Sequence, residues 1–193
     1  MSTYKDMEQY AMENHVPVIQ DEGFEFLKKL ILENNCHSLL EIGTAIGYTA
    51  IRAAGLFDDM KVVTIERNPD MIEQAKKNIT EAGLWDKITL IEGDALNTEV
   101  EGEFDCIFID AAKAQYQRFF NRYCPLLKPD GIIVSDNMNF HGLVEHPENT
   151  HNRNTKQLVH KIQMYRDFLQ ELPDWECEFY NYGDGIAVAR RKK

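Results

Sequence analysis

The chain has 193 residues, of which 44% are hydrophobic, and this is enough to bury the core of one globular domain spanning residues 1–193. Its formal net charge of −11 argues against a generally basic nucleic-acid binder. No apolar run approaches the roughly 20 residues of a membrane span, and residues 1–6 lack the apolar core of a secretory signal, so we expect a cytoplasmic protein with no membrane partner.

The first predicted unit is a helical cap segment over residues 1–35. Apolar side chains between Tyr4 and Leu32 recur at helical spacing, which is the pattern that predicts it. The four cysteines, at positions 36, 106, 124 and 177, are scattered without a Cys-x-x-Cys pair. This spacing argues against a zinc centre or a redox couple, so we expect reduced thiols, most of them buried.

From residue 38 to residue 135, apolar runs alternate with longer segments of helical period, which indicates a parallel sheet covered on both faces. The predicted strands are Ser38–Ile42, Val62–Glu66, Ile88–Glu92, Cys106–Ile109 and Ile132–Ser135. The predicted helices between them are Ala45–Leu56, Pro69–Ala82 and Gln115–Cys124. The second helix has the clearest signals, because Asn68 supplies an N-cap, Pro69 a first-turn proline and Gly83 a stop.

After Asn137 the pattern changes to a polar loop and a long helix from Thr155 to Leu169. Two further strands, Trp175–Tyr180 and Ile186–Arg190, flank a glycine-containing connector, which indicates an antiparallel hairpin that closes the sheet. The predicted fold class is therefore α/β, with a mostly parallel sheet, an antiparallel C-terminal hairpin and helices on both faces.

The first predicted strand runs into a glycine-containing turn, residues 41–47 (EIGTAIG), where the backbone can approach a ligand closely. The turn is not a dinucleotide fingerprint, because an acid precedes Gly43 and three residues separate it from Gly47. An acid here disfavours phosphate and suits a cationic ligand such as the aminoacyl end of S-adenosylmethionine. Glu66 ends the second strand where a ribose needs an acceptor, and residues 93–95 end the third where an adenine would lie. Three such features at successive strand ends predict a nucleotide-type cofactor.

Polar side chains also end the last two strands of the parallel set. Asp110 follows one apolar run, and Asp136 with Asn137 follows the next. Because the carboxyl ends of parallel strands face one crevice, these three side chains could converge as oxygen ligands for a hard cation, with Lys113 standing over it. Each residue alone has a plainer interpretation, since strand-end aspartates often cap helices or turns and lysines are often on the surface. Their joint spacing favours the cation site.

Five segments together resemble the cation-dependent class I O-methyltransferases, the family of catechol and caffeoyl-CoA O-methyltransferases. They are residues 41–50, 64–69, 92–95, 108–113 and 135–137, and the resemblance covers nearly the whole chain. It implies a seven-stranded, Rossmann-like methyltransferase fold. It also implies an S-adenosylmethionine site formed by Glu41, Gly43, Thr44, Gly47, Tyr48, Thr49, Glu66, Arg67, Gly93, Asp94, Ala95 and Asp110. The same resemblance implies that Asp110, Asp136 and Asn137 hold Mg²⁺ or another divalent cation.

The chemistry of these residues permits that function. Three oxygen ligands leave an octahedral Mg²⁺ three positions, enough for a water and two neighbouring substrate oxygens. A catechol offers vicinal hydroxyls and 5-hydroxyuridine offers O5 beside O4, so the same site geometry serves either substrate. Chelation would lower the hydroxyl pKa and align the oxyanion with the methyl group, while Lys113 accepts the proton or stabilises the oxyanion. We therefore expect Asp110 and Lys113 to be the catalytic residues.

Within the family, residues 15–19, 110–116 and 183–188 are most similar to the bacterial tRNA 5-hydroxyuridine methyltransferases. This implies methylation in the tRNA anticodon loop, at the wobble position, to 5-methoxyuridine. Such an enzyme needs a basic surface near its pocket. Residues 151–193 hold eight Lys and Arg against six Asp and Glu, so the acidic excess lies in the first 150 residues. The candidate RNA contacts are Arg118, Arg122, Arg153, Lys156 and the C-terminal basic run 190–193.

Two alternatives stay open. One is an O-methyltransferase that acts on a small catechol or hydroxycinnamoyl compound, and the other is a non-catalytic module that binds S-adenosylmethionine. The family resemblance also implies a homodimer, formed through the segment from Tyr4 to Leu32 and the edge of the sheet.

Overall fold

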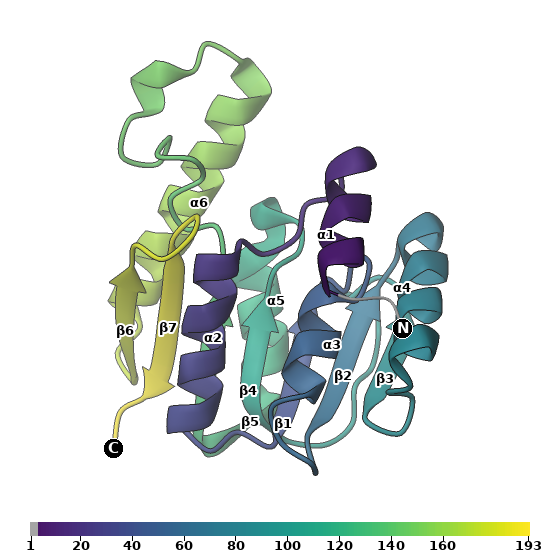
Figure 1. Ribbon diagram of the computed structural model, residues 1–193. Helices are drawn as coiled ribbons and strands as arrows, with labels where there is room; N and C mark the ends of the chain where they lie inside the picture. The colour runs from purple at the N-terminus through teal and green to yellow at the C-terminus, as the bar shows by residue number, and fades with distance from the viewer. Residues whose placement is uncertain (1–3) are drawn as a thin grey trace.

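A computed structural model describes residues 4–193 and places seven strands in one sheet of order β3-β2-β1-β4-β5-β7-β6 (Figure 1). The strands are β1 (Ser38–Ile42), β2 (Lys61–Glu66), β3 (Ile88–Glu92), β4 (Phe104–Ile109), β5 (Leu127–Ser135), β6 (Trp175–Tyr180) and β7 (Ile186–Arg191). The first five are parallel, and β7 runs antiparallel to both β5 and β6. The predicted fold class is confirmed, including the C-terminal hairpin.

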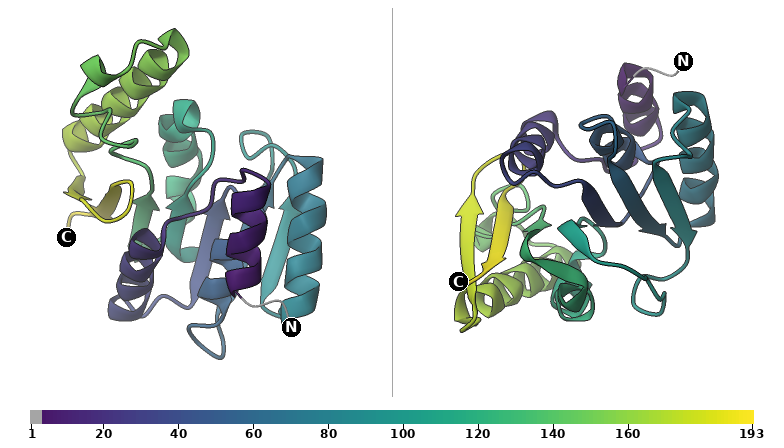
Figure 2. Two further views of the ribbon diagram at one scale, coloured as in Figure 1. Left: turned by 45° about the horizontal axis from the view of Figure 1, so that its top comes forward. Right: turned by 90° about the horizontal axis from the view of Figure 1, so that it is seen from below.

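Six α-helices cover the two faces of this sheet. They are α1 (Tyr4–Glu13), α2 (Asp21–Glu33), α3 (Tyr48–Ala54), α4 (Pro69–Ala82), α5 (Tyr116–Tyr123) and α6 (Arg153–Glu171). Seen along the sheet, α1 to α4 lie on one face and α5 and α6 on the other (Figure 2). Among residues 4–193, no helix is both long enough and apolar enough to cross a membrane.

Each parallel strand contributes alternate side chains to two separate hydrophobic cores. Leu39 of β1 packs into the core under α1 to α4, whereas its neighbour Leu40 packs into the core under α5 and α6. In β4, Phe108 and Ile107 divide in the same way. Because successive side chains point to opposite faces, a strand buried on both faces is apolar at most positions, and Glu41 of β1 is an exception. This is why the runs in the sequence are continuous rather than alternating.

The ends of α4 agree with the sequence prediction because its signals are local. The side chain of Asn68 accepts hydrogen bonds from the backbone N–H groups of Asp70 at 2.9 Å and Met71 at 3.4 Å. Pro69 occupies the first turn, and Gly83 ends the helix with a φ of 67°.

Several other predicted bounds were wrong. The helix predicted over Ala45–Leu56 is shorter and begins at Tyr48, because Ala45 and Gly47 have left-handed φ angles of 46° and 82°. The helix predicted from Gln115 begins one residue later, after a 3₁₀ turn, η1 (Lys113–Gln115). The N-terminal cap is two helices, α1 and α2, separated by residues 14–20.

Two further bound errors lie in the C-terminal half. The strand predicted over Ile132–Ser135 begins at Leu127 instead and runs through Pro129, where its register against β4 shifts. The long helix extends beyond Thr155–Leu169 at both ends, and Asn152 is its N-cap. Two short 3₁₀ turns, η2 (Cys124–Leu126) and η3 (Pro147–Asn149), complete the helical elements. All four cysteines are free, with Cys36 and Cys106 buried and the other two partly buried.

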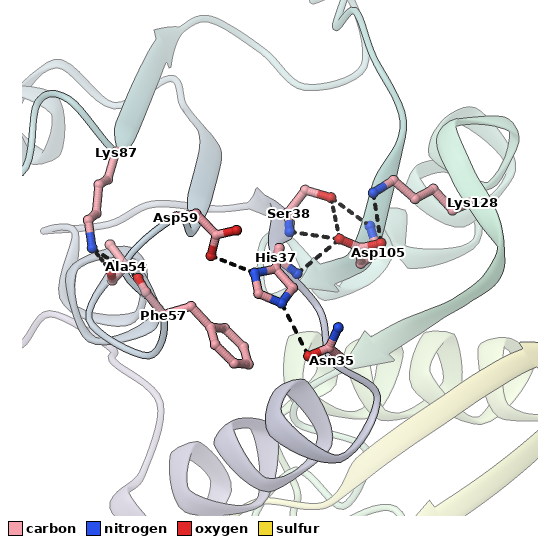
Figure 3. A network of polar contacts seen from close by, with 9 residues as sticks. All are labelled: Asn35, His37, Ser38, Ala54, Phe57, Asp59, Lys87, Asp105 and Lys128. Carbon is pink, nitrogen blue, oxygen red and sulfur yellow. Dashed lines mark hydrogen bonds and ion pairs between the residues drawn. The ribbon is translucent and has the colours of Figure 1, made fainter.

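A polar network around Asp105 closes the amino-terminal edge of the parallel strands (Figure 3). One carboxylate oxygen accepts hydrogen bonds from the backbone N–H groups of His37 and Ser38, both at 2.9 Å, and from the Ser38 hydroxyl at 2.8 Å. The other accepts from the Lys128 ammonium at 2.8 Å. Burial alone would raise the pKa of Asp105, but the hydrogen bonds from Lys128, Ser38 and His37 outweigh it and lower that pKa.

Candidate active site

A cavity of about 760 Å³ opens at the carboxyl ends of β1 to β4. Its volume lies within the range of about 300–1,000 Å³ that small-molecule sites usually have. The predicted site residues on its wall are Gly43, Thr44, Tyr48, Thr49, Glu66, Arg67, Asp94, Ala95, Asp110 and Lys113. The predicted residues that are not part of the wall are Glu41, Gly47, Gly93, Asp136 and Asn137. The structure therefore gathers most of the predicted cofactor residues and both predicted catalytic residues around one space.

The turn after β1 touches the end of β4 through its backbone. Gly43 has a φ of 104°, and a Cβ at this position would stand 2.2 Å from the carbonyl oxygen of Asp110. No side chain fits such a contact, so glycine is required here for both space and conformation. The N–H groups of Gly43 and Thr44 both donate to the carbonyl of Ile65, at 3.1 and 3.2 Å. These contacts hold the turn after β1 against the ends of β2 and β4.

Glu66 closes the turn from the side of β2. Its carboxylate accepts the backbone N–H of Ala45 on one oxygen and those of Arg67 and Asn68 on the other, all at 2.9 Å. A carboxylate has about four acceptor sites, so the oxygen facing Ala45 retains capacity for a ligand hydroxyl. The arrangement is consistent with the predicted contact to a ribose, which stays a prediction.

Asp94 lies in the loop after β3, where it accepts hydrogen bonds from two nearby residues. It accepts the backbone N–H of Leu96 at 2.9 Å and a hydrogen bond from the guanidinium of Arg67 at 3.1 Å. The bond from Leu96 is the main reason that the pKa of Asp94 is lowered, and Arg67 adds to the effect. Asp94 is therefore an ionised acceptor at the cavity wall near neutral pH.

Glu41 lies behind the wall rather than on it. It is 1% exposed and accepts a hydrogen bond of 2.5 Å from the hydroxyl of Thr64, its neighbour across the β1–β2 pair. Thr64 in turn lies 2.6 Å from the hydroxyl of Thr44, which does line the cavity. Burial raises the pKa of Glu41 to about 8, although the bond from Thr64 opposes the shift. Its link to the cavity runs through two threonine hydroxyls.

Tyr48 presents its ring to the cavity and its hydroxyl to the N-terminal helices. The hydroxyl donates to the carboxylate of Glu8 on α1 at 2.5 Å and accepts from the guanidinium of Arg52 at 2.6 Å. Arg52 also bonds to Asp21 on α2 at 2.9 Å. These contacts join α1 and α2 to α3 beside the cavity.

Two carboxylates, Asp110 and Asp136, follow the neighbouring strands β4 and β5. The backbone N–H of Asp136 donates to the carbonyl of Ile109 at 3.2 Å, which places the two strand ends together. Burial first, and Asp110 second, raise the pKa of Asp136 to about 8. Burial also raises the pKa of Asp110, against the opposing charge of Lys113.

The donor set fits a hard cation. Asp136 is 3% exposed, and within residues 4–193 its Oδ1 atom has no hydrogen-bond partner. An unpaired buried carboxylate oxygen is costly unless an ion or another donor reaches it. No group of three or more His, Cys, Asp and Glu side chains in the described chain is placed to hold a metal ion. The predicted set differs from such a group because its third member is the amide of Asn137.

Lys113 lies on η1, on the same wall as Asp110. Its ammonium group is 5.9 Å from the centre of the Phe140 ring, in the loop that follows the predicted cation ligands. Its charge opposes the rise in the pKa of both Asp110 and Asp136 that burial causes. The predicted catalytic pair is thus brought together at the cavity.

The segment between α1 and α2 was missed as part of the site. Residues 14–19 line the cavity, and so do Met71, Arg118 and Phe119. Residues 15–19 were singled out in the sequence only by their resemblance to relatives, and no local pattern there predicts a cavity wall. The contact joins residues far apart in the chain, so local periodicity does not predict it.

Comparisons with known proteins place the chain among O-methyltransferases. A model of the O-methyltransferase family matches residues 2–192. Caffeoyl-CoA O-methyltransferase 1 of Eucalyptus globulus is 34% identical over 186 residues, which cover 89% of this chain and 73% of that protein. A crystal structure of a putative caffeoyl-CoA O-methyltransferase from Staphylococcus aureus is 38% identical, with a TM-score of 0.94 over 100% of this chain and 93% of that one. An O-methyltransferase from Bacillus cereus in complex with SAH is 28% identical, with a TM-score of 0.84 over 100% and 91% of the two chains.

Proposed function

The chain belongs to the O-methyltransferase family, and from this premise we propose that it methylates 5-hydroxyuridine at the wobble position of tRNA, with a divalent cation such as Mg²⁺ bound beside the cofactor. It is an S-adenosylmethionine-dependent enzyme of the caffeoyl-CoA O-methyltransferase-like group. The nucleoside and the cation are what we add.

The observation that carries the proposal is the position of Asp110. Its backbone abuts Gly43 of the cofactor turn, and its carboxylate shares an electrostatic field with Asp136. The cavity and the two carboxylates, of which Asp136 is buried and Asp110 partly buried, therefore meet at one residue. Asp110, Asp136 and Asn137 would hold the cation, which would polarise two adjacent oxygens of the substrate and lower the pKa of the reacting hydroxyl.

The residues of the chain then have distinct tasks. Thr44, Glu66 and Asp94 orient the methyl donor along the strand ends, beside the turn at Gly43. Lys113, on the same wall as Asp110, takes up the proton of the reacting hydroxyl or balances the oxyanion. Holding donor and acceptor in line supplies the rest of the rate enhancement.

The tRNA assignment is supported by basic side chains around the mouth of the cavity. Arg67 and Arg118 line it, and Arg122 is exposed on the same helix as Arg118. Arg153 and Lys156 are exposed at the start of α6, which rises above the sheet together with the loop before it (Figure 1). Phosphate contacts from such side chains are the main source of affinity for RNA. They offset the acidic charge of the remaining surface at the place where a large substrate would dock.

A small phenolic substrate is the second candidate. The observation in its favour is the 34% identity to a plant caffeoyl-CoA O-methyltransferase across 89% of this chain. The same ligand set, Asp110, Asp136 and Asn137, would chelate vicinal hydroxyls.

Nucleoside analysis tests the proposal. In a strain that lacks the gene for this chain, bulk tRNA should lose 5-methoxyuridine at the wobble position and accumulate 5-hydroxyuridine. Complementation with the wild-type chain should restore the modification, and complementation with Asp136→Ala should not. Unchanged 5-methoxyuridine in the deletion strain, together with faster turnover of caffeoyl-CoA or catechol by the purified protein, would favour the second candidate.

We further propose that the protein is a homodimer. The aromatic ring of Phe26 on α2 stacks on exposed Tyr182 in the β6–β7 turn, with ring centres 4.3 Å apart, and contacts Tyr180 at 4.7 Å. This apolar group joins the N-terminal segment to the edge of the sheet, which is where we expect the second subunit. Light scattering at micromolar concentration should give twice the chain mass of 22.4 kDa, and a monomer mass would contradict the dimer.

A further inference from the structure

The side-chain amide of Asn137 lies between two carboxylates. Its nitrogen, Nδ2, is 3.4 Å from Oδ2 of Asp136 and 3.4 Å from Oδ2 of Asp184. An amide nitrogen donates hydrogen bonds, whereas an amide oxygen only accepts them. The opposite orientation would bring the oxygen to the same two carboxylates, and both would repel it. The amide oxygen of Asn137 is therefore the end that is left for another partner.

Asp184 is held in place on the hairpin between β6 and β7. Its side chain is buried, and its Oδ1 atom accepts the backbone N–H of His141 at 2.5 Å. Its carbonyl accepts the backbone N–H of Asn139 at 2.8 Å. Gly185 has a φ of 83°, and a Cβ there would stand 2.7 Å from the nitrogen of Asn139. The hairpin thus fixes the Asp184 carboxylate relative to the segment that carries Asn137.

We propose that Asp184 is a positioning residue for the divalent cation, which it influences by holding Nδ2 of Asn137 so that Oδ1 of Asn137 serves as the third oxygen ligand. The inference rests on the cation dependence in the proposed function. Groups that hydrogen-bond to metal ligands orient them, and their loss typically lowers metal affinity about 10- to 100-fold. Asp184 itself is not a ligand.

The same contacts explain why position 137 carries an amide. Asp110, Asp136 and Asp184 already place three carboxylates around this point, and the last two are buried. A further carboxylate at position 137 would add electrostatic repulsion with these three carboxylates. An amide offers an acceptor to the cation and a donor to Asp184 at the same time, so it is the side chain that satisfies both neighbours.

Binding of Mn²⁺ to the full-length protein tests the inference, with the free ion followed by electron paramagnetic resonance. Asp184→Asn should raise the Kd for Mn²⁺ about tenfold or more. Asp184→Ser provides a second variant, because its hydroxyl can still accept the N–H of His141 while the carboxylate beside Asn137 is removed. Thermal unfolding without metal shows whether each variant is folded.

A double-variant cycle separates positioning from the plain loss of a charge. In an Asn137→Ala background, Asp184→Asn should change the Kd by less than about twofold, because the group through which it acts is gone. The matched control is Asn181→Ala, which removes a 3.2 Å bond to Asn139 across the same two loops without touching Asn137. It should leave the Kd of the wild type within about twofold.

The outcomes are distinct. A folded Asp184 variant with an unchanged Kd overturns the inference, whatever its unfolding temperature. An additional tenfold loss in the Asn137→Ala background, or an equal loss in the Asn181→Ala control, also overturns it. A wild-type protein that does not bind Mn²⁺ at all overturns the cation dependence of the proposed function instead, and would be recognised before any variant is made.

Discussion

Asp105 and Asp110 lie at opposite ends of β4, and the surrounding structure shifts the pKa of their carboxylates in opposite directions. The carboxylate of Asp105 accepts four hydrogen bonds of 2.8 to 2.9 Å, and these bonds lower its pKa. At the other end, burial raises the pKa of both Asp110 and its neighbour Asp136, and one oxygen of Asp136 has no partner within residues 4–193. The hydrogen bonds to Asp105 stabilise one edge of the sheet, whereas the unpaired oxygen of Asp136 at the other edge costs stability, as buried polar groups at ligand sites commonly do.

The strongest way to break this comparison is Asp136→Ala. The variant loses a ligand of the proposed cation, so we expect methyl transfer to fall at least about 100-fold, in line with the several kcal/mol that a metal contributes to such a step. Without cation the unfolding temperature should stay equal or rise, because an unpaired buried carboxylate is removed. Transfer of a radiolabelled methyl group and calorimetry measure the two quantities. A stability loss that parallels the activity loss would contradict the contrast between the edges.

The converse substitution at the paired edge is Asp105→Ala. It leaves the backbone N–H groups of His37 and Ser38 and the ammonium of Lys128 without their acceptor. We expect a loss of about 2–3 kcal/mol in the free energy of unfolding, because hydrogen bonds to a charged group are the stronger kind. Urea titration measures it. The Kd for S-adenosylmethionine, whose proposed site lies at the opposite edge, should change little, and a large change would show that the edges are not independent.

A pH series sharpens the comparison at Glu41, whose pKa is raised by burial to about 8 in the folded chain from an ordinary value of 4.5. Because the folded state holds the proton more tightly, the stabilisation is complete below the unfolded pKa and is lost as pH rises towards 8. The slope is at most about 1.4 kcal/mol per pH unit. In Glu41→Gln this contribution should be absent, so unfolding between pH 5 and 8 should depend less on pH. The exposed Glu81→Gln is the control and should keep the wild-type slope.

The smallest expected effect concerns Lys128→Met. The ammonium contacts Asp105 at 2.8 Å, but its side chain is 41% exposed, so solvent screens the pair. Exposed ion pairs contribute about 0–1 kcal/mol, and Asp105 keeps its bonds from Ser38 and His37. We expect a loss of less than about 1 kcal/mol in urea titration. A loss as large as that of Asp105→Ala would mean that one ion pair, rather than the whole network, closes the edge.

Elements with local signals were predicted well from the sequence. The bounds of α4 follow from Asn68, Pro69 and Gly83, which act within one turn of the helix. The start of α3 was not predictable in the same way, because the left-handed φ of Ala45 arises where the turn is pressed against β4. The early start of β5 depends on a shift in register against β4, which is a tertiary property.

The candidate site likewise has some features that local sequence patterns predict and others that depend on tertiary packing. Asp110, Asp136 and Asn137 could be located because strand periodicity and parallel topology bring strand ends to one edge. The burial of Glu41 behind Thr64 depends on which face of β1 each side chain takes, and this is set by the packing of two cores. Lining by residues 14–19 depends on how two helices fold back over the sheet. Patterns in the sequence name the candidate ligands at the strand ends, while long-range packing decides what surrounds them.

The contact between Gly43 and Asp110 sets a limit for anyone who wishes to redesign this enzyme. With 2.2 Å between a Cβ at position 43 and the Asp110 carbonyl oxygen, even alanine at this position would displace the end of β4. Libraries aimed at donors with larger groups than methyl should therefore leave the turn alone. Substitutions that reshape the pocket are better placed at wall residues outside the hydrophobic core, such as the exposed Arg118.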